Sequence, residues 1–247
     1  MRQLLVFGVS LIASLLSSLS GGGSSIIAIP VFLSMGISFP MATAMQKVNA
    51  CFWVLPAARN YLKGREIDWR FAIAFAMIGL VGAYLGLLVV LSLNPRVLNA
   101  IVGVVVLLLV IYIQVRSEVG LSEQVVTSRA KRLASYLIAL PMGFYESLLG
   151  AGNGIFFVAA SFYTRGFDFI TALGYYFMTA FVWVAFAAGV LIHKGYFSWS
   201  LMLPTVLGAL AGGYCGSRLA RLKGNRFVKL VFVLVGGALA LKLILGV

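Results

Sequence analysis

The sequence predicts an all-α polytopic membrane protein built from two inverted repeats, each a Gly-rich broken, re-entrant helix hairpin plus three transmembrane helices. Three observations lead to this prediction. First, 62% of the 247 residues are hydrophobic, 10% are charged, and the mean hydropathy is +1.06, whereas a soluble domain carries about 25% charged residues. Second, a glycine run in the first half has a counterpart in the second half. Third, the basic residues are unevenly spread between the apolar segments.

Each half of the sequence contains five apolar segments. Those of the first repeat (1–115) are Leu4–Leu19, Ile26–Met35, Met41–Leu62, Trp69–Leu93 and Val97–Val115. A polar linker (116–132), expected on the cytoplasmic side, leads to the second repeat (133–247), whose segments are Leu133–Leu149, Ile155–Tyr163, Phe169–Ile192, Trp199–Leu219 and Phe227–Leu245. Apolar stretches of about 18 residues or more are long enough to cross a bilayer as helices. We therefore expect one integrated transmembrane domain in the lipid bilayer.

Short sequences match between the two halves at an offset of 130 or 131 residues. The pairs are KGREIDW (63–69) with KGYFSW (194–199), GAYLG (82–86) with GGYCG (212–216), and NPRVLN (94–99) with GNRFVK (224–229). Matches in the same order at a steady offset indicate an internal duplication. Glycines spaced by four residues let helices approach closely, so we interpret the following as packing positions: Gly82, Gly86, Gly208, Gly212 and Gly216.

A glycine run lies between the first two apolar segments of each half. Residues 20–25 read SGGGSS, and residues 150–154 read GAGNG. Each Gly within a helix costs about 1 kcal/mol relative to Ala, so we expect the helix to break at both runs. A break in a bilayer leaves N–H and C=O groups that only protein or a water-filled cavity can satisfy. Broken apolar helices in corresponding places of two repeats are typical of a transporter's binding site.

Two topologies are compatible with these segments, and they distribute Lys and Arg differently. If each broken pair crosses once, the repeats are parallel and the two sides carry 11 and 7 basic residues. If each pair is a re-entrant hairpin, the repeats are inverted and the sides carry 14 and 4, with Lys47 inside the membrane in both cases. Basic residues gather in cytoplasmic loops, and Ile26–Met35 can span only about half of a hydrocarbon core. We therefore favour inverted repeats with both termini outside the cytoplasm.

Three stretches resemble the TauE/SafE family of sulfite exporters and anion permeases. They are SLSGGGSSIIAIPVFLSMGISFPMATA (18–44), GREIDWRFAIAFAMIGLVGAYLG (64–86) and LLGAGNGIFF (148–157). Gly21–Gly23, Pro30 and Ala42-Thr43 match the family pattern of a Gly-rich break, a proline and an Ala-Thr step, whereas Asn153 stands where a further glycine is commoner. The resemblance covers essentially the whole chain. It implies a multi-pass protein of the bacterial inner membrane that moves small sulfur-containing anions, such as sulfite, sulfonates, sulfoacetate or thiosulfate-like ions.

The second limb of each hairpin begins directly after the glycines, and this start is a candidate anion site. Free N–H groups and the positive end of the helix dipole bind anions without a charged side chain. Nearby polar side chains would add donors. The expected substrate-binding residues are Ser20, Gly21, Gly22, Gly23, Ser24, Ser25, Thr43, Gln46, Lys47, Asn49, Gly150, Gly152, Asn153, Gly154, Tyr175, Tyr176 and Thr179. The alternative interpretation is that the glycines only permit a tight turn.

Two charged residues lie inside apolar segments. Burying Lys47 costs about 2–3 kcal/mol on insertion scales, so we expect it to supply a fixed positive charge to the anion or to reach toward the interface. Glu146 is expected to pair with Lys47, to couple transport to protons, or to make a structural hydrogen bond. The four tryptophans are interpreted as membrane anchors or packing residues: Trp53, Trp69, Trp183 and Trp199.

These patterns predict a secondary transporter of a small anionic solute, with protons as the candidate coupling ion. The alternative is an anion channel with the same site. A scaffold has no need of helix breaks, and an enzyme needs a nucleophile, a base with partners, or metal ligands. With one His and two separate Cys, we expect no enzyme activity, cofactor or metal. The basic residues lie between apolar segments, so we expect no nucleic-acid partner; the sequence indicates no oligomeric state.

Overall fold

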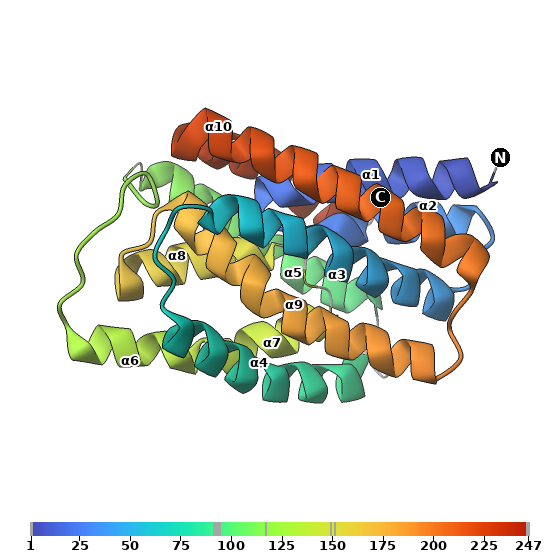
Figure 1. The fold of residues 1–247 in the computed structure, drawn as a ribbon, viewed down its shortest axis with the longest axis horizontal. Helices are drawn as coiled ribbons and strands as arrows, with labels where there is room; N and C mark the ends of the chain where they lie inside the picture. The colour runs from blue at the N-terminus through green and yellow to red at the C-terminus, as the bar shows by residue number, and fades with distance from the viewer. Residues whose placement is uncertain (1, 91–94, 117, 149, 151, 246–247) are drawn as a thin grey trace.

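The computed structural model describes residues 2–90, 95–116, 118–148, 150 and 152–245, which form a bundle of helices (Figure 1). Long helices run roughly parallel to the longest axis of the molecule (Figure 1). The helices are α1 (Arg2–Ser20), α2 (Ser24–Ser34), α3 (Phe39–Leu62), α4 (Trp69–Val90), α5 (Pro95–Val115), α6 (Arg129–Leu137), α7 (Ala139–Leu148), α8 (Asn153–Arg165), α9 (Phe169–His193) and α10 (Trp199–Leu245). The backbone of α10 turns at Gly224, with φ +82° and ψ 179°, so α10 contains the fourth and fifth expected segments of the second half.

One expected segment is divided into two helices. The sequence predicts a helix over Leu133–Leu149, but α6 ends at Leu137 and α7 begins at Ala139. Pro141 has no N–H to donate to the carbonyl of Leu137, four residues earlier, so the helical hydrogen-bond ladder is interrupted there. Leu149 and Ala151, which belong to the expected segment and to the second glycine run, lie outside the described residues.

Helix α6 begins earlier than the sequence predicts, inside the stretch expected to be linker. The side chain of Ser128 accepts a hydrogen bond from the backbone N–H of Lys131 and caps the first turn. Serine is among the preferred residues at this capping position. The polar stretch before α6 is therefore shorter than the expected 116–132.

The first glycine run separates α1 from α2, and the two helices fold back against each other. Gly21, Gly22 and Gly23 have φ values of +77°, +123° and +112°, a region that other L-residues rarely adopt. At the far end of the pair, the Arg2 guanidinium donates to the carbonyl of Met35 (3.4 Å). The outer ends of α1 and α2 thus lie together, at one end of the molecule.

The chain also folds back around the second glycine run, so that α8 lies beside α6. Arg165, the last residue of α8, donates through Nε to Ser135 Oγ of α6 (3.0 Å). Its guanidinium also lies 3.8 Å from the ring centre of Phe71 in α4. The end of α8 therefore lies beside α6, toward the end of the molecule opposite the outer ends of α1 and α2 (Figure 1).

We call this the linker end, because the 118–128 stretch crosses it together with the loops at 63–68 and 166–168 (Figure 1). A cluster of polar side chains joins these segments. Asp168 caps α9 by accepting from the N–H of Thr171 (2.7 Å) and also binds Arg65 (3.0 Å) and Asn225 (3.0 Å). Burial by itself would raise the pKa of Asp168, but hydrogen bonds from Asn225 and Thr171 and the charge of Arg65 hold that pKa below its ordinary value.

Helices α3 and α9 pack together at the centre of the bundle. The ring of Phe177 in α9 meets Trp53 edge-on, with centroids 4.9 Å apart, and Tyr61 at 5.7 Å. The Tyr61 hydroxyl donates to the carbonyl of Ser18 (2.7 Å), close to the first glycine run. These contacts position the middle of α3 and α9 against the helix break.

Glycines of α4 and α10 bring these helices against the hairpin of the other half. A Cβ on Gly212 would collide with the carbonyl of Leu11 in α1, and a Cβ on Gly82 would collide with the carbonyl of Leu140 in α7. Since α10 packs on α1 and α4 on α7, the two halves use corresponding surfaces. The interpretation of these glycines as packing positions is confirmed.

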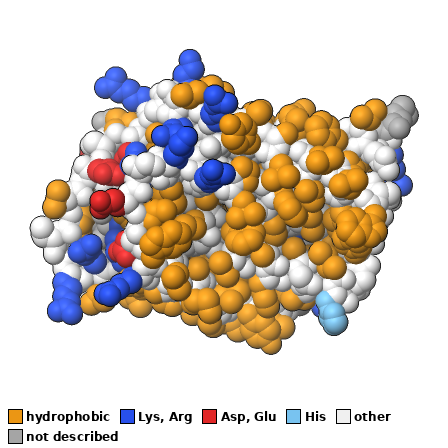
Figure 2. Space-filling model, viewed as in Figure 1, with side chains coloured by type: hydrophobic (Ala, Val, Ile, Leu, Met, Phe, Trp, Pro, Cys, Tyr) orange, Lys and Arg blue, Asp and Glu red, His pale blue; other side chains and the backbone are white. Residues whose placement is uncertain are grey.

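Apolar side chains cover much of the outside of the bundle. Among the described residues, four helical stretches are long and apolar enough to span a membrane: Arg2–Ser20, Trp69–Val89, Phe169–His193 and Trp199–Lys242. Figure 2 shows hydrophobic side chains across the middle of one face, with most of its visible Lys and Arg side chains toward the linker end. Trp69 and Trp199, each the first residue of its helix, are 59% and 76% exposed. The fold is that of a polytopic α-helical membrane protein.

We predict that Gly212→Ala lowers the stability of the protein by about 1–3 kcal/mol, because the added methyl group forces α10 away from α1. Thermal unfolding of the purified protein in detergent measures this effect. Gly189→Ala is the matched control, since no atom lies within 4 Å of a Cβ there and Ala favours a helix over Gly. Equal stability of Gly212→Ala and the wild type would contradict the packing interpretation.

Candidate functional site

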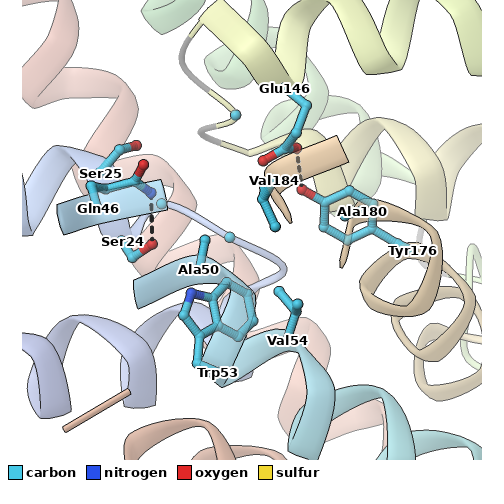
Figure 3. Close-up of a pocket in the computed structure, with 13 residues that line it drawn as sticks. Ser24, Ser25, Gln46, Ala50, Trp53, Val54, Glu146, Tyr176, Ala180 and Val184 are labelled. Carbon is cyan, nitrogen blue, oxygen red and sulfur yellow. Dashed lines mark hydrogen bonds between the residues drawn. The ribbon is translucent and has the colours of Figure 1, made fainter. Parts of the chain in front are cut away.

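A small cavity lies at the centre of the bundle, between the two glycine runs (Figure 3). Four elements form its wall: the first glycine run with the start of α2, the middle of α3, the end of α7 with Gly150, and the middle of α9. The lining residues are Gly22, Gly23, Ser24, Ser25, Gln46, Ala50, Trp53, Val54, Glu146, Gly150, Tyr176, Ala180 and Val184. Its volume is about 10 Å³, which is room for about one water molecule.

The two glycine runs touch through their backbones. The N–H of Gly154 donates to the carbonyl of Gly21 (3.0 Å), and a Cβ on Gly22 would lie 3.4 Å from the carbonyl oxygen of Gly150. A Cβ on Gly154 would collide with the backbone of Gly21. A side chain at position 154 would keep the runs apart, so the contact depends on glycine there.

The first turns of α2 and α8 differ in how their amides are used. In α8, the amides of Asn153, Gly154 and Ile155 donate to the carbonyls of Gly150, Gly21 and Gly152, at 3.4, 3.0 and 2.8 Å. In α2, the amide of Ile26 donates to the carbonyl of Gly23 (3.1 Å), and in the run before it the amide of Gly22 donates to the carbonyl of Ser17 (2.9 Å). The earlier amides of a helix have no intrahelical acceptor. Gly23 and Ser24 line the cavity at the positive end of the α2 dipole.

Ser24 and Gln46 add polar groups on the α2 side of the cavity. The Gln46 side-chain amide donates to Ser24 Oγ (3.3 Å), which leaves the serine hydroxyl hydrogen available for another acceptor. Both side chains are at least nine-tenths buried. They lie together in Figure 3, at the start of α2 and on α3.

The opposite side of the cavity carries a buried carboxylate. Glu146 is 8% exposed, and its Oε2 accepts hydrogen bonds from the Tyr176 hydroxyl (2.7 Å) and the Asn153 side-chain amide (2.7 Å). Asn153 also donates to the carbonyl of Met142 (3.0 Å). Its Oδ1 has no hydrogen-bond partner among the described residues. The glycine-rich family pattern is interrupted at Asn153 by a side chain that holds this carboxylate in place.

Lys47 lies near Glu146 but contacts its backbone. Its Nζ donates to the carbonyl of Glu146 (2.7 Å), and the ion pairs among the described residues include no pair between these two side chains. A lysine that binds one of the last carbonyls of a helix satisfies an unpaired acceptor at the negative end of the dipole. The expected Lys47–Glu146 pair is thus a cap on the end of α7, and Lys47 is not among the cavity-lining residues.

Three hydroxyl-bearing residues of the expected site bond to nearby backbone. Thr43 donates to the carbonyl of Phe39, Thr179 to that of Tyr175, and Ser20 to that of Leu16, at 2.8, 3.0 and 2.8 Å. Hydroxyls that bind carbonyls one turn earlier are common in helices. None of the three hydroxyl-bearing side chains lines the cavity.

Asn49 and Tyr175 point away from the cavity. Asn49 Oδ1 accepts from Ser14 Oγ of α1 (2.9 Å). The Tyr175 hydroxyl accepts from the N–H of Asp68 at the linker end (2.6 Å), and its ring stacks on Phe167 with centroids 4.7 Å apart. Tyr175 and Tyr176 are neighbours in sequence, yet only Tyr176 lines the cavity.

Five lining residues were not among the expected site residues: Ala50, Trp53, Val54, Ala180 and Val184. Two signals in the sequence could have found them. On α3, positions 50, 53 and 54 follow Gln46 by four, seven and eight residues, which places them on one helical face. Positions 46, 50 and 54 also correspond to 176, 180 and 184 at the offset of 130 residues. The cavity is therefore lined by equivalent positions of the two halves.

The described residues contain no group of three or more His, Cys, Asp and Glu side chains arranged to hold a metal ion. The polar groups at the cavity are amides, hydroxyls, an indole and one carboxylate. Such groups bind a small solute through hydrogen bonds.

Comparison with known proteins gives full-length relatives. A "Probable membrane transporter protein ORF9" of Sinorhizobium sp is 28% identical over 240 residues, covering 97% of this chain and 91% of the relative. "Probable membrane transporter protein YfcA" of Escherichia coli K12 is 24% identical, with 97% and 88% of the two chains covered. A "Probable membrane transporter protein" of Haemophilus influenzae is 23% identical, with 97% and 93% covered.

The sequence model of one protein family matches residues 6–243, and its description is "Sulfite exporter TauE/SafE". The match extends over both halves, and the resemblance noted in the sequence is confirmed. With its apolar helices and its relatives in bacteria, the chain is a multi-pass membrane protein, which in bacteria resides in the inner membrane. The chain belongs to the TauE/SafE family.

Proposed function

We propose that the protein is a secondary transporter of small sulfur-containing anions, which bind in the central cavity and cross the membrane together with a proton. The observation that carries this proposal is the cavity itself, which has helix-terminal amides and hydroxyls on one side and a buried carboxylate on the other. The family description, sulfite exporter, and the relatives named as probable membrane transporters support a transport role.

The α2 side of the cavity supports an anionic substrate. An oxyanion would accept hydrogen bonds from the Gly23 and Ser24 amides and from the Ser24 hydroxyl, at the positive end of the α2 dipole. Lys47 is part of this proposal through its charge, since its ammonium group lies at the end of α7 near the cavity. A membrane enzyme or a scaffold role gains no support from this arrangement of donors.

The opposite side supports coupling to protons. A negatively charged substrate and the Glu146 carboxylate would repel each other in the low dielectric of a buried site. A proton on Glu146 removes this repulsion, while Tyr176 and Asn153 keep the group in place. We propose that the anion and the proton bind together and leave together.

The small volume of the cavity favours a transporter over a channel. A channel conducts through a continuous pore, whereas this cavity has room for about one water molecule. Access for a solute therefore requires the lining helices to move. The hydrogen bond from Gly154 to Gly21 joins the two glycine runs, and we propose that relative movement of the two hairpins opens the cavity to one side at a time.

The contacts at the helix ends support inverted repeats with re-entrant hairpins. The outer ends of α1 and α2 meet through Arg2 and Met35, and at the other end the last residue of α8, Arg165, binds Ser135 of α6. Three further helical stretches follow each hairpin. We propose that the linker end, where basic residues gather, faces the cytoplasm.

This topology predicts that both termini lie outside the cytoplasm. Fusions of alkaline phosphatase, which is active outside the cytoplasm, and of green fluorescent protein, which is fluorescent inside it, test the prediction. We expect active phosphatase at the C-terminus and fluorescence after residue 120 in the linker. A fluorescent C-terminal fusion would overturn the inverted arrangement.

Uptake into proteoliposomes tests the binding site. We expect saturable uptake of sulfite or sulfoacetate, accelerated by the same anion on the other side of the membrane. Gly22→Ala should reduce uptake about tenfold or more, since 1.4 kcal/mol of strain or lost contact corresponds to tenfold. At φ +123° an added methyl group is strained, and it would lie against Gly150 between the two runs.

Gly36→Ala is the matched control for this substitution. Gly36 also has a positive φ, +75°, but no atom lies within 4 Å of a Cβ there. The two variants thus share the backbone strain of a non-glycine residue and differ in the contact between the glycine runs. Equal uptake by Gly22→Ala and Gly36→Ala would count against the site, and non-saturable flux would indicate a channel.

Glu146→Gln should make uptake independent of pH. In the wild type, we expect uptake to depend on pH, whereas glutamine is uncharged at every pH and still accepts hydrogen bonds from Tyr176 and Asn153. Initial rates measured from mildly acidic to mildly alkaline pH provide the test. Glu66→Gln, a change at an exposed acid, should keep the wild-type profile; a pH-dependent Glu146→Gln variant would remove Glu146 from proton coupling.

A further inference from the structure

Trp53 presents a buried N–H without an acceptor at the wall of the cavity. Its side chain is 4% exposed, and Nε1 has no hydrogen-bond partner among the described residues. Figure 3 shows the indole with its nitrogen on the edge turned toward Ala50 and Ser24. Most buried donors in proteins are paired, so an unpaired donor beside a cavity indicates a ligand that completes it.

The equivalent tryptophan of the second half has a different environment. Trp183 follows Trp53 by the 130-residue offset and is also fully buried, but its Nε1 donates to the carbonyl of Ala76 in α4 (2.8 Å). Trp183 is not among the residues that line the cavity. The two tryptophans at matching positions therefore differ. The Trp183 indole N–H joins α9 to α4, whereas the Trp53 indole N–H lies at the cavity without an acceptor among the described residues.

From this contrast we infer that the Trp53 indole N–H donates a hydrogen bond directly to an oxygen of the transported anion. The inference rests on the proposed function, because it assigns a donor within the same cavity. An indole N–H donates and cannot accept, so it favours a deprotonated oxygen over a hydroxyl group. Together with the Ser24 hydroxyl it would give the site two neutral donors, which suit a sulfite or sulfonate group with several acceptor oxygens.

The rest of the Trp53 side chain is held by packing, so the N–H alone can be removed. The ring meets Phe177 edge-on at 4.9 Å, and its backbone lies against α10, where a Cβ on Gly213 would contact the Trp53 carbonyl oxygen at 2.5 Å. Phenylalanine keeps an aromatic ring against Phe177 but has no N–H. Trp53→Phe therefore separates hydrogen bonding from packing.

Purified protein in detergent, titrated with sulfite and separately with sulfoacetate, provides the test. We expect Trp53→Phe to weaken binding about tenfold or more, as for loss of a hydrogen bond to a charged group, with little change in melting temperature. Trp183→Phe is the matched control. It removes the bond to Ala76 and should lower the melting temperature, while the folded protein binds the anion with wild-type affinity.

The indole N–H resonance of Trp53 gives a second, direct measurement. In protein labelled with ¹⁵N-tryptophan, the signal missing from Trp53→Phe identifies this N–H, and we expect it to move downfield as the anion is added. Unchanged affinity in Trp53→Phe together with an unmoved resonance would overturn the inference. If wild-type protein binds neither anion, the proposed function itself fails, and the two failures are thus distinguishable.

Discussion

The contact between the two glycine runs is the feature on which the rest of the structure depends. A helix that stops inside a bilayer exposes amides and carbonyls that lipid cannot satisfy. Here the other half of the chain supplies a hydrogen-bond partner for one of these groups, since the Gly154 amide donates to the Gly21 carbonyl. Because glycine has no side chain, the two backbones come close enough to form this hydrogen bond. The cavity lies beside this contact and is lined by Gly23 and Ser24 at the start of α2.

Close helix packing keeps the two glycine runs next to each other. Glycines on α10 bring it against the backbone of α1, and glycines on α4 bring it against α7. Each helix pair is thus packed against a long helix of the other half, and the position of each glycine run depends on both halves. In a membrane, where apolar side chains gain little by leaving lipid, such close approach is a main source of helix association.

The sequence predicted the helices and the breaks well, because both depend on local properties. Apolar length and glycine runs determine where a helix begins and ends, and among the residues that the structure describes the sequence does not predict the interruption before Pro141 or the early start of α6. The cavity lining was harder, because it depends on which way a helix is rotated. Tyr175 and Tyr176 are adjacent, and the sequence offers no reason to choose between them. The sequence alone favours a membrane anchor or a packing residue at Trp53, although its spacing from Gln46 places it on the cavity face.

Equivalent positions of the two halves carry different residues at the cavity, and these differences indicate how many ions the cavity can bind at once. The position that corresponds to Glu146 in the first half is Leu16, and Asn153 corresponds to Gly23. A duplicated site with two equal halves would offer two sets of open amides, but the α8 amides already have acceptors. At the cavity, the first half thus contributes Gly23 and Ser24, and the second half contributes a carboxylate with its hydrogen-bond partners. On the proposed function, this asymmetry fits one anion and one proton side by side better than two anions, because a second anion would meet Glu146 without donors to hold it.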